Sequence, residues 1–582
     1  MLIINLSDQL KNHPHLIEGA SHILDLRAKV LNEKSLDISF FGDAEEIFPH
    51  GLDAYKGYLQ KLIEEDTEAK EFLDIKLNDI PLFWFTETAI KHSIFFWAKD
   101  YFLLLSLVEL GSKIINEKFD KVQITLPQEI LHFQPALEDI LNAKGLDIPL
   151  EIIGLEPVSN ISLAKLLKSC LGRSLKILRF SAPGKNTVNS KPQHLFLVNN
   201  TNNVHTQEKL YKPLKALFDE QNKELQILPF MEWIESSSSQ AIPSAYYQAK
   251  PPIFQLLRLN IKIFRTFFRL KKTKIKDLMY DGFSYPASFI QYDLIKSLYH
   301  NIYIFYTQLW LSNYLKATPQ LATLFFEDEF YQPGKCIISA ASPLGIKTIG
   351  LQHGHFNEAH TVYKLGSAER AADSNPLPDV FVVWGRKYKE LFDKQGKGIK
   401  PRVEALGFPS YISRAKLSSP KEEKGNEILW CLTTKECFQL EWDILKNSKE
   451  LEKFSIKIRL HPVPHVKRED VTDLLGSYPF SFSETQGIED AIKAADIVMG
   501  SAHSTTFIDA LVNKRPSLRL ISNRWVQRFQ SEKDALYDVK NGQELDQVLS
   551  KLNQPKKAET HTSEDEFLLL EKAAWKDFIQ NL

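Results

Sequence analysis

The chain has 582 residues, more than one hydrophobic core usually supports, so two or three domains are expected. Hydrophobic residues make up 43% and charged residues 25%, the mix of a globular protein, so long disordered regions are not expected. The formal net charge of -1 gives no overall electrostatic reason to bind nucleic acid, and no nucleic-acid partner is expected.

The number of cysteines and the character of residues 1–8 indicate the cellular compartment of the protein. The chain has four cysteines without paired metal-ligand spacing, and so few in so long a chain favour a reducing cytoplasm: Cys170, Cys336, Cys431 and Cys437. Residues 1–8 lack a basic stretch followed by an apolar core, so no secretory signal is expected. The protein is therefore predicted to be cytoplasmic.

The first 190 residues are predicted to be a helix-rich region of the first lobe, with strands at 122–126 and 150–154. Two strongly apolar stretches, 95–108 and 302–315, are shorter than the ~20 residues that span a bilayer. Lys99 and Asp100 also interrupt the first of them. Both stretches are predicted to be buried helices.

From about residue 190 short apolar segments alternate with helical ones, which is typical of a parallel α/β layer. Residues 191–415 are therefore predicted to be a Rossmann-like lobe. One helix is expected to run toward Phe218 and another over 334–344. The expected strands are 194–198, 225–230, 322–326, 347–351, 380–384 and 402–406.

The stretch 416–426 is charged, contains Pro and Gly and has no periodicity, so it is predicted to be a linker. Residues 427–555 are predicted to form a second Rossmann-like lobe, and 556–582 a C-terminal helix. The expected elements of this lobe are strands 427–431, 455–460, 497–499 and 517–520, and helices 439–448, 488–495 and 505–512. The fold class is α/β, with two Rossmann-like lobes facing a cleft.

Polar residues follow two expected strands of the second lobe, where open parallel sheets bind ligands. Arg459, His461 and Pro462 end one strand. The other strand leads into a small, hydroxyl-rich turn before a helix, which suits a phosphate: Gly500, Ser501, Ala502, His503, Ser504, Thr505 and Thr506. Two simpler readings stay open: Ser504 or Thr505 only caps the helix, and His-Pro only ends a strand.

The first lobe has a second polar set at neighbouring strand ends. Glu327, Asp328 and Glu329 follow one strand, and 352–355, which is Gln-His-Gly-His, follows the next. Carboxylates and imidazoles placed together are what general-base catalysis on a hydroxyl requires, with a solvated acidic loop as the alternative. A zinc site formed by His353, His355 and His360 has no familiar ligand spacing, so no metal is expected.

Five segments together resemble a known group of enzymes: 345–354, 379–385, 406–409, 458–462 and 496–511. They are similar to bacterial surface-carbohydrate transferases of the GT-B fold over about residues 320–525. Within that group, capsule β-Kdo transferases, bacterial polysialyltransferases and CDP-glycerol glycerophosphotransferases share a His-Pro element and a late Ser/Thr element. The resemblance implies surface-polysaccharide synthesis, as in capsule, O-antigen or lipopolysaccharide.

The resemblance also implies roles for individual residues. His461 contacts the donor phosphate, Ser504 and Thr505 bind the phosphate of CMP or CDP, and Asp509 lies near the ribose. Glu327, Asp328 or His353 serves the acceptor. The residues expected to bind substrate are Gln352, Gly354, His355, Arg459, Pro462, Gly500, Ser501, His503, Ser504, Thr505, Thr506 and Asp509.

The chain departs from those families at two places. Phe330 follows the acidic triplet where the polysialyltransferase motif has Gly, and Gln352 stands where the glycerophosphotransferases have Trp. The base, the donor class and the stereochemical outcome therefore stay open.

The predicted function is a metal-independent glycosyltransferase that needs no cofactor. The nucleotide-linked donor, CMP- or CDP-linked by preference and carrying a sugar such as Kdo or sialic acid, binds the second lobe. A glycan or lipid-linked glycan acceptor binds the first lobe, and polar groups of the second lobe stabilise the leaving phosphate. The alternatives are a polyol-phosphate transferase of the CDP-glycerol type, a sugar-nucleotide epimerase and a non-catalytic carbohydrate-assembly protein.

Residues 253–276 predict an amphipathic helix without an acidic residue before Asp277. One stripe is basic, comprising Arg258, Lys262, Arg265, Arg269, Lys272 and Lys276. Its neighbour is apolar, comprising Phe254, Leu257, Ile261, Phe264 and Phe268. Either the apolar side packs on the protein and the basic side is solvated, or the helix contacts anionic lipid at the inner face of the membrane.

Overall fold

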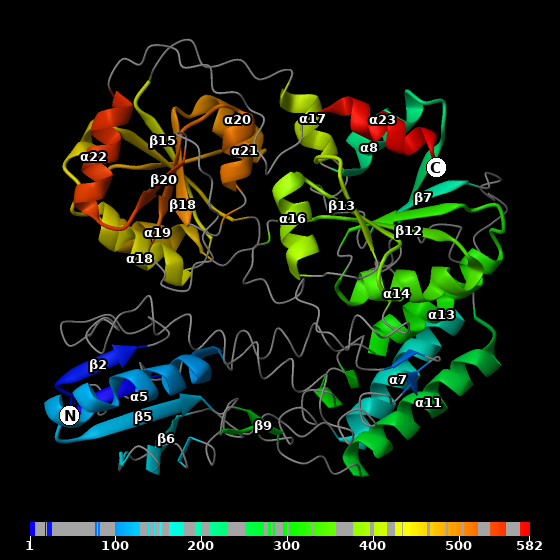
Figure 1. Cartoon of the computed structure of the whole chain (residues 1–582), viewed down its shortest axis with the longest axis horizontal. Helices are drawn as coiled ribbons and strands as arrows, with labels where there is room; N and C mark the ends of the chain where they lie inside the picture. The colour runs from blue at the N-terminus through cyan, green and yellow to red at the C-terminus, as the bar shows by residue number, and fades with distance from the viewer. Residues whose placement is uncertain are drawn as a thin grey trace.

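The computed structural model describes most of the elements of the chain. The described residues are chiefly 1–5, 20–25, 99–127, 150–153, 162–179, 192–198, 210–229, 251–272, 302–327, 330–354, 376–395, 401–415, 425–433, 435–461, 466–484, 487–501, 504, 506–521, 536–553 and 571–582. Three parallel sheets organise these residues (Figure 1).

The N-terminal sheet has the strand order β2-β1-β5-β6, and all neighbouring strands are parallel. Its strands are β1 (Leu2–Asn5), β2 (His22–Asp25), β5 (Val122–Pro127) and β6 (Leu150–Ile153), with helix α5 (Lys99–Lys118) before β5. Strands β5 and β6 confirm the two expected for this region, whereas β1 and β2 were not anticipated. The helix-rich first region thus also contains a sheet.

The middle sheet has the order β14-β13-β12-β11-β7-β8, again parallel throughout. Every residue of β7, β11 and β13 is buried, because helices cover both faces. The strands are β7 (His194–Val198), β8 (Leu225–Pro229), β11 (Thr323–Phe326), β12 (Lys347–Leu351), β13 (Val380–Val383) and β14 (Arg402–Ala405). The helices are α8 (Lys212–Asp219), α13 (Ile302–Lys316), α14 (Gln332–Ala341), η6 (Ser342–Leu344), α16 (Arg386–Gln395) and α17 (Pro409–Ala415).

The C-terminal sheet is parallel and has the order β17-β16-β15-β18-β19-β20. Successive strands are added on one side of β15 up to β17 and on its other side from β18 onward, so the strand order reverses between β15 and β18. Its strands are β15 (Glu427–Cys431), β16 (Ser455–Arg459), β17 (Ser481–Phe482), β18 (Ile497–Ser501), β19 (Ser517–Leu520) and β20 (Leu536–Val539). Its helices are α18 (Lys435–Leu445), η8 (Glu450–Lys453), α19 (Arg468–Leu475), α20 (Ile488–Ala494), α21 (Thr506–Val512) and α22 (Gly542–Asn553). The expected α/β class with two Rossmann-like lobes is confirmed.

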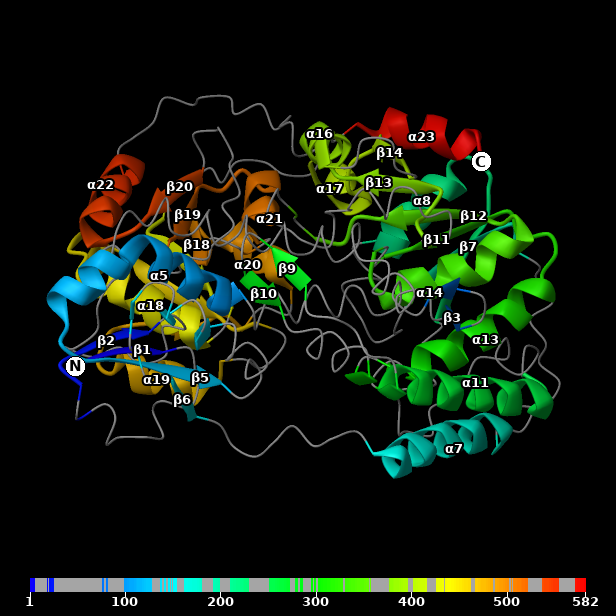
Figure 2. The same ribbon diagram turned by 60° about the horizontal axis from the view of Figure 1, so that its bottom comes forward.

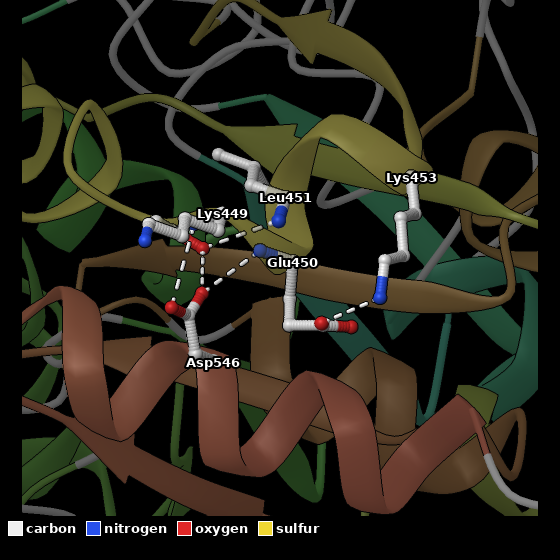
Figure 3. Close-up of polar contacts among 6 residues, drawn as sticks. Lys449, Glu450, Leu451, Lys453 and Asp546 are labelled. Atoms are coloured by element: carbon white, nitrogen blue, oxygen red, sulfur yellow. Dashed lines mark hydrogen bonds and ion pairs between the residues drawn. The ribbon is translucent and has the colours of Figure 1, made fainter.

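The side chain of Asp546 joins helix α22 to helix η8 in the C-terminal lobe (Figure 3). Asp546 of α22 accepts hydrogen bonds from Ser448 Oγ at 2.5 Å and from the backbone N–H of Glu450 at 3.0 Å. Burial alone would raise the pKa of Asp546, but these hydrogen bonds outweigh it and lower that pKa below its ordinary value. Asp546 therefore acts as an N-terminal cap for η8 from outside the helix.

The last helix, α23 (Lys572–Gln580), returns to the middle sheet and packs beside α8 (Figure 1). Trp575 is fully buried, and its Nε1 donates to the carbonyl oxygen of Gly407 at 3.0 Å. Lys223 Nζ donates to the carbonyl oxygen of Ile579 at 2.7 Å. The end of the chain thus covers the lobe that precedes the expected linker, most of which lies outside the described residues.

Helices α7 (Leu163–Arg179) and α11 (Ile253–Lys272) lie together at the outer edge of the molecule, next to α13 (Figures 1 and 2). Two short antiparallel hairpins complete the described elements: β3 (Lys76–Leu77) with β4 (Ile80–Pro81), and β9 (Leu278–Tyr280) with β10 (Phe283–Tyr285). Among the helices that the structure describes, none has the length and apolar character to cross a membrane.

Candidate functional site

The candidate site lies where β15 and β18 run side by side at the reversal point of the C-terminal sheet. Open parallel sheets bind ligands beyond the carboxyl ends of their strands at such a point, because the connections on either side diverge. Cys431 at the end of β15 pairs with Gly500 of β18, and β18 continues to Ser501. Strand β18 is therefore two residues longer than the expected strand 497–499, and it includes Gly500 and Ser501, the first two residues of the predicted turn.

Gly500 is required by the close approach of these two strands. A Cβ at this position would lie 2.7 Å from the carbonyl oxygen of Cys431, closer than real Cβ contacts allow. The absence of a side chain lets the backbone of β18 pass directly beside the end of β15. Gly500 was predicted to bind substrate, and its local role is to permit this strand spacing.

Ser501 is buried and belongs to a hydrogen-bonded cluster beneath the turn. Its hydroxyl lies 2.8 Å from Thr433 Oγ1 and donates to Glu441 Oε1. Trp430 Nε1 donates to Glu441 Oε2 at 2.8 Å. The glutamate thus connects β15, β18 and α18 through one carboxyl group. Its two oxygens fix the indole and the serine hydroxyl in place.

Glu441 is fully buried, and burial raises the pKa of its carboxyl to about 7, partly offset by the hydrogen bonds from Ser501 and Trp430. Burial therefore disfavours the charged form of this carboxyl relative to an exposed glutamate. A carboxyl group tuned in this way at a sheet reversal point is typical of a functional site. Neither Glu441 nor Thr433 was predicted from the sequence.

The helix after Ser501 begins with a hydroxyl cap. Ser504 Oγ accepts a hydrogen bond from the backbone N–H of Thr506 at 3.3 Å and donates to Thr506 Oγ1 at 3.0 Å. The backbone N–H of Ser504 donates to the carbonyl oxygen of Ser501 at 2.9 Å, which closes the turn. This geometry supports the simpler capping interpretation for Ser504, and it leaves the phosphate-binding role as a prediction. Three expected residues of the turn, Ala502, His503 and Thr505, lie outside the described residues.

Charged groups from three elements surround the end of β15. Burial raises the pKa of the Cys431 thiol to about 12; Arg459 opposes that rise, and Asp509 and Glu441 add to it. Asp509 of α21 is 5% exposed, so its side chain lies inside the lobe rather than on its surface. Arg459 is half-buried and His461 is exposed, both at the end of β16. Pro462 lies outside the described residues.

The first-lobe set also comes from neighbouring strands. Phe326 of β11 pairs with Gly350 of β12, so Glu327 and His353 leave the sheet at the same edge. Glu327 is 8% exposed, and the His353 ring meets the Tyr331 ring edge to face with centroids 5.5 Å apart. Asp328, Glu329 and His355 lie outside the described residues. Glu327 and His353 are therefore the two described residues at this edge that could accept a proton.

Gln352 is held entirely within the protein. Its Nε2 donates to the carbonyl oxygen of Gly354 at 2.8 Å, and its Oε1 accepts from the backbone N–H of Trp384 at 2.9 Å. The indole Nε1 of Trp384 donates to the backbone oxygen of Gln352, also at 2.9 Å. The residue predicted to bind substrate thus joins the ends of β12 and β13 and sets the path of the His353-Gly354 backbone.

Of the three histidines His353, His355 and His360, only His353 lies within the described residues. Within the part of the chain that the structure describes, no group of three or more His, Cys, Asp or Glu side chains is placed to hold a metal ion. The four cysteines are all buried as free thiols.

No protein-family model matches the chain, and no curated protein resembles it in sequence. Solved structures do resemble it. UDP-GlcNAc 2-epimerase of Methanocaldococcus jannaschii, bound to UDP-GlcNAc and UDP, is 10% identical with a TM-score of 0.38, over 66% of this chain and 98% of that one. The UDP-forming trehalose-phosphate synthase of Burkholderia vietnamiensis is 9% identical with a TM-score of 0.40, over 67% and 100%.

MurG of Acinetobacter baumannii is 10% identical with a TM-score of 0.31, over 67% of this chain and 100% of that chain. Likenesses this distant assign no activity to the chain. The Rossmann-like character of its lobes rests instead on its own strand order, which is 3-2-1-4-5-6 along the chain in the C-terminal sheet.

Proposed function

We propose that the chain is a nucleotide-sugar-dependent glycosyltransferase whose donor binds at the reversal point of the C-terminal sheet. One observation supports this above all: Ser501 ends β18 at that point, and a buried hydrogen-bond cluster fixes it to Glu441 and Thr433. Arg459 and His461 end the second strand along, β16, beyond β15. A hydroxyl fixed at the end of β18, with Arg459 and His461 at the end of β16 on the same sheet, suits the phosphate of a nucleotide.

The proposed reaction requires one proton acceptor and one site for the leaving phosphate. The base at the end of β11 or β12, Glu327 or His353 with Asp328 as a further option, takes the proton of an acceptor hydroxyl. The acceptor oxygen then forms a bond to the anomeric carbon while the bond from that carbon to the donor phosphate breaks. Arg459 and His461 stabilise the negative charge on the departing phosphate. No metal is needed for this step.

The finer assignment rests on the sequence resemblance. We propose a CMP- or CDP-linked donor, with an ulosonic acid such as Kdo or sialic acid as the transferred sugar. The acceptor is a surface polysaccharide or a lipid-linked glycan, of the kind found in capsule, O-antigen or lipopolysaccharide. The same resemblance includes CDP-glycerol transferases, so the alternative reaction is transfer of a polyol phosphate. The product assay must be able to detect both reactions.

The first experiment is a thermal-shift panel of CMP, CDP, UDP, GDP and ADP with the purified chain. A nucleotide that binds the native state at 100 times its dissociation constant adds about 2.7 kcal/mol to the free energy of unfolding. We expect a shift with CMP or CDP that is reduced in His461→Ala. His461 is exposed, so this change should leave the fold intact. The matched control is Lys540→Ala, an exposed residue after β20.

The second experiment follows products from the corresponding nucleotide sugar. Transfer predicts nucleotide release only when an acceptor is present. Isomerisation of the sugar nucleotide without an acceptor would identify an epimerase instead. Binding of no nucleotide in the panel would contradict the proposal and favour a carbohydrate-assembly protein without catalysis.

A further inference from the structure

The outer helices α7 and α11 expose large apolar side chains in an unusual concentration. Ten large hydrophobic side chains are exposed within the described part of the chain, and nine of them lie on these two helices. On α7 they are Leu163, Leu167, Leu171 and Leu175. On α11 they are Ile253, Phe254, Leu257, Ile261 and Phe268. Their exposed fractions range from 37% for Leu163 to 64% for Phe254.

Both helices also have a second apolar stripe, which packs against the protein. Helix α11 buries a separate stripe through Leu256, Ile263 and Phe267, and α7 buries Leu166 and Ile177. Each helix therefore has two apolar stripes, one against the protein and one against solvent. A surface helix whose outer side faces only water needs just the apolar stripe that packs against the protein.

Hydrogen bonds among three buried side chains fix the rotation of both helices. Asn260 Nδ2 of α11 donates to Ser174 Oγ of α7 at 3.0 Å. The hydroxyl of Tyr306 on α13 donates to Asn260 Oδ1 and contacts the carbonyl oxygen of Cys170 at 3.0 Å. Burial is the main cause that raises the pKa of Tyr306, which stays a neutral donor. The exposed stripes are thus held outward by the fold and are not free to turn inward.

All charged side chains on α7 and α11 are basic. Neither the 17 residues of α7 nor the 20 residues of α11 include an Asp or Glu. Exposed basic side chains adjoin the apolar stripes on both: Lys165 and Lys168 on α7, and Arg258, Arg265, Arg269 and Lys272 on α11. Both views show the two helices side by side at the outer edge of the molecule (Figures 1 and 2).

We infer that α7 and α11 form a docking surface for an anionic lipid bilayer. The apolar side chains enter the acyl boundary while the Lys and Arg side chains remain at the level of the anionic headgroups. The combination of apolar stripes with flanking cations and no acidic residue complements a lipid surface. The sequence left open whether the stripe through Phe254, Leu257, Ile261, Phe264 and Phe268 packs on the protein; of these only Phe264 is half-buried, and the other four are exposed. In the structure a different stripe packs, and α7 contributes the second half of the surface.

Vesicle co-sedimentation tests the electrostatic part of this inference without any nucleotide or acceptor. The full chain should sediment with phosphatidylglycerol vesicles but not with phosphatidylcholine vesicles, and 1 M salt should weaken the binding because it shortens the screening length to about 3 Å. Reversing Arg258, Arg265 and Arg269 to Glu should lower the partition coefficient at least about tenfold. The control reverses three exposed lysines elsewhere: Lys118, Lys121 and Lys493. An equal loss in this control would overturn the inference, because it would mean that only net charge matters.

Insertion is tested separately. Leu171→Ser combined with Leu257→Ser should also lower binding at least about tenfold while retaining every basic residue. A polarity-sensitive dye on Leu171→Cys should shift to the blue with anionic vesicles, whereas the same dye on Lys118→Cys should not; the four native cysteines are buried. Unchanged binding of the serine variant would refute the inference. So would a concentration-dependent dimer that the serine variant abolishes, because a second copy would then be the occupant. Circular dichroism and the nucleotide thermal shift verify that each variant is folded.

Discussion

Glu441→Gln removes a titrating carboxyl from the candidate site while keeping its shape. In the wild type the carboxyl accepts hydrogen bonds from Trp430 Nε1 and Ser501 Oγ. A glutamine can accept from the indole through its oxygen and donate to the serine through its amide nitrogen. The substitution therefore changes the protonation chemistry of the cluster and preserves its hydrogen bonding.

The size and sign of the effect follow from the pKa. Burial raises the pKa of Glu441 from 4.5 to about 7, and each pKa unit corresponds to about 1.36 kcal/mol, so the difference amounts to about 3 kcal/mol. Because the folded-state pKa is above the unfolded value, the folded state binds the additional proton between these two pH values. The stabilising contribution is complete below about pH 4.5 and is lost as pH rises through about 7. Glu441→Gln should therefore gain stability relative to the wild type from pH 5 to pH 8.

Hydrogen exchange of the β15 and β18 amides is the suitable assay, because it measures the opening free energy of this sheet without requiring the whole chain to unfold in two states. Comparing variant and wild type at each pH cancels the intrinsic exchange rate. We expect the difference between them to grow by about 3 kcal/mol from pH 5 to pH 8. The control is Glu469→Gln, an exposed position on α19. Parallel pH profiles for Glu441→Gln and wild type would refute the assignment of a buried, titrating carboxyl.

Two further predictions concern the frame of the C-terminal lobe. Gly500→Ala should lower the opening free energy of the β15 and β18 amides by about 1–3 kcal/mol in hydrogen exchange, since its Cβ would meet the Cys431 carbonyl oxygen at 2.7 Å. The control Gly172→Ala, with no atom within 4 Å of the new Cβ, should leave those amides unchanged and raise the opening free energy of α7 by up to about 1 kcal/mol. Asp546→Ala should cost about 1–2 kcal/mol at pH 7, because the cap of η8 is lost. Asp546 has a lowered pKa, so its contribution is present above the ordinary value of 3.8 and disappears as pH falls below it; a deficit that stays constant down to pH 2 would contradict this.

The sequence predicted strands well where an apolar run is short and ends abruptly. The expected strands at 194–198, 347–351, 427–431 and 517–520 agree with β7, β12, β15 and β19 at both ends. Strand β20 was missed because the exposed Asp538 interrupts its four residues, and β17 because it has two residues. Strand β1 was not predicted, although its Leu2, Ile3 and Ile4 are fully buried.

Helix α11 shows what periodicity leaves undecided. Its apolar and basic stripes are clear from the spacing, but a helix with apolar residues on more than one side has more than one way to pack. Tertiary contacts decide: Asn260 finds Ser174 and Tyr306, which lie 86 and 46 residues away along the chain. A polar residue inside an apolar stripe thus marked the packed side, and its partners were not identifiable from spacing.

The same limit applies to the polar residues at the strand ends, where a side chain can serve the ligand or the fold. Gln352 and Ser501 both end buried strands and both were predicted to bind substrate, yet their surroundings differ. Gln352 uses its amide to join β12 to β13 through Trp384, a purely internal connection. Ser501 connects to Glu441, 60 residues earlier, a glutamate whose sequence position on an ordinary helix predicts solvent exposure because glutamate is rarely buried. A buried acid held beneath a hydroxyl turn costs stability at neutral pH, which packing alone does not require. For this reason we propose the donor site at β18 rather than at Gln352.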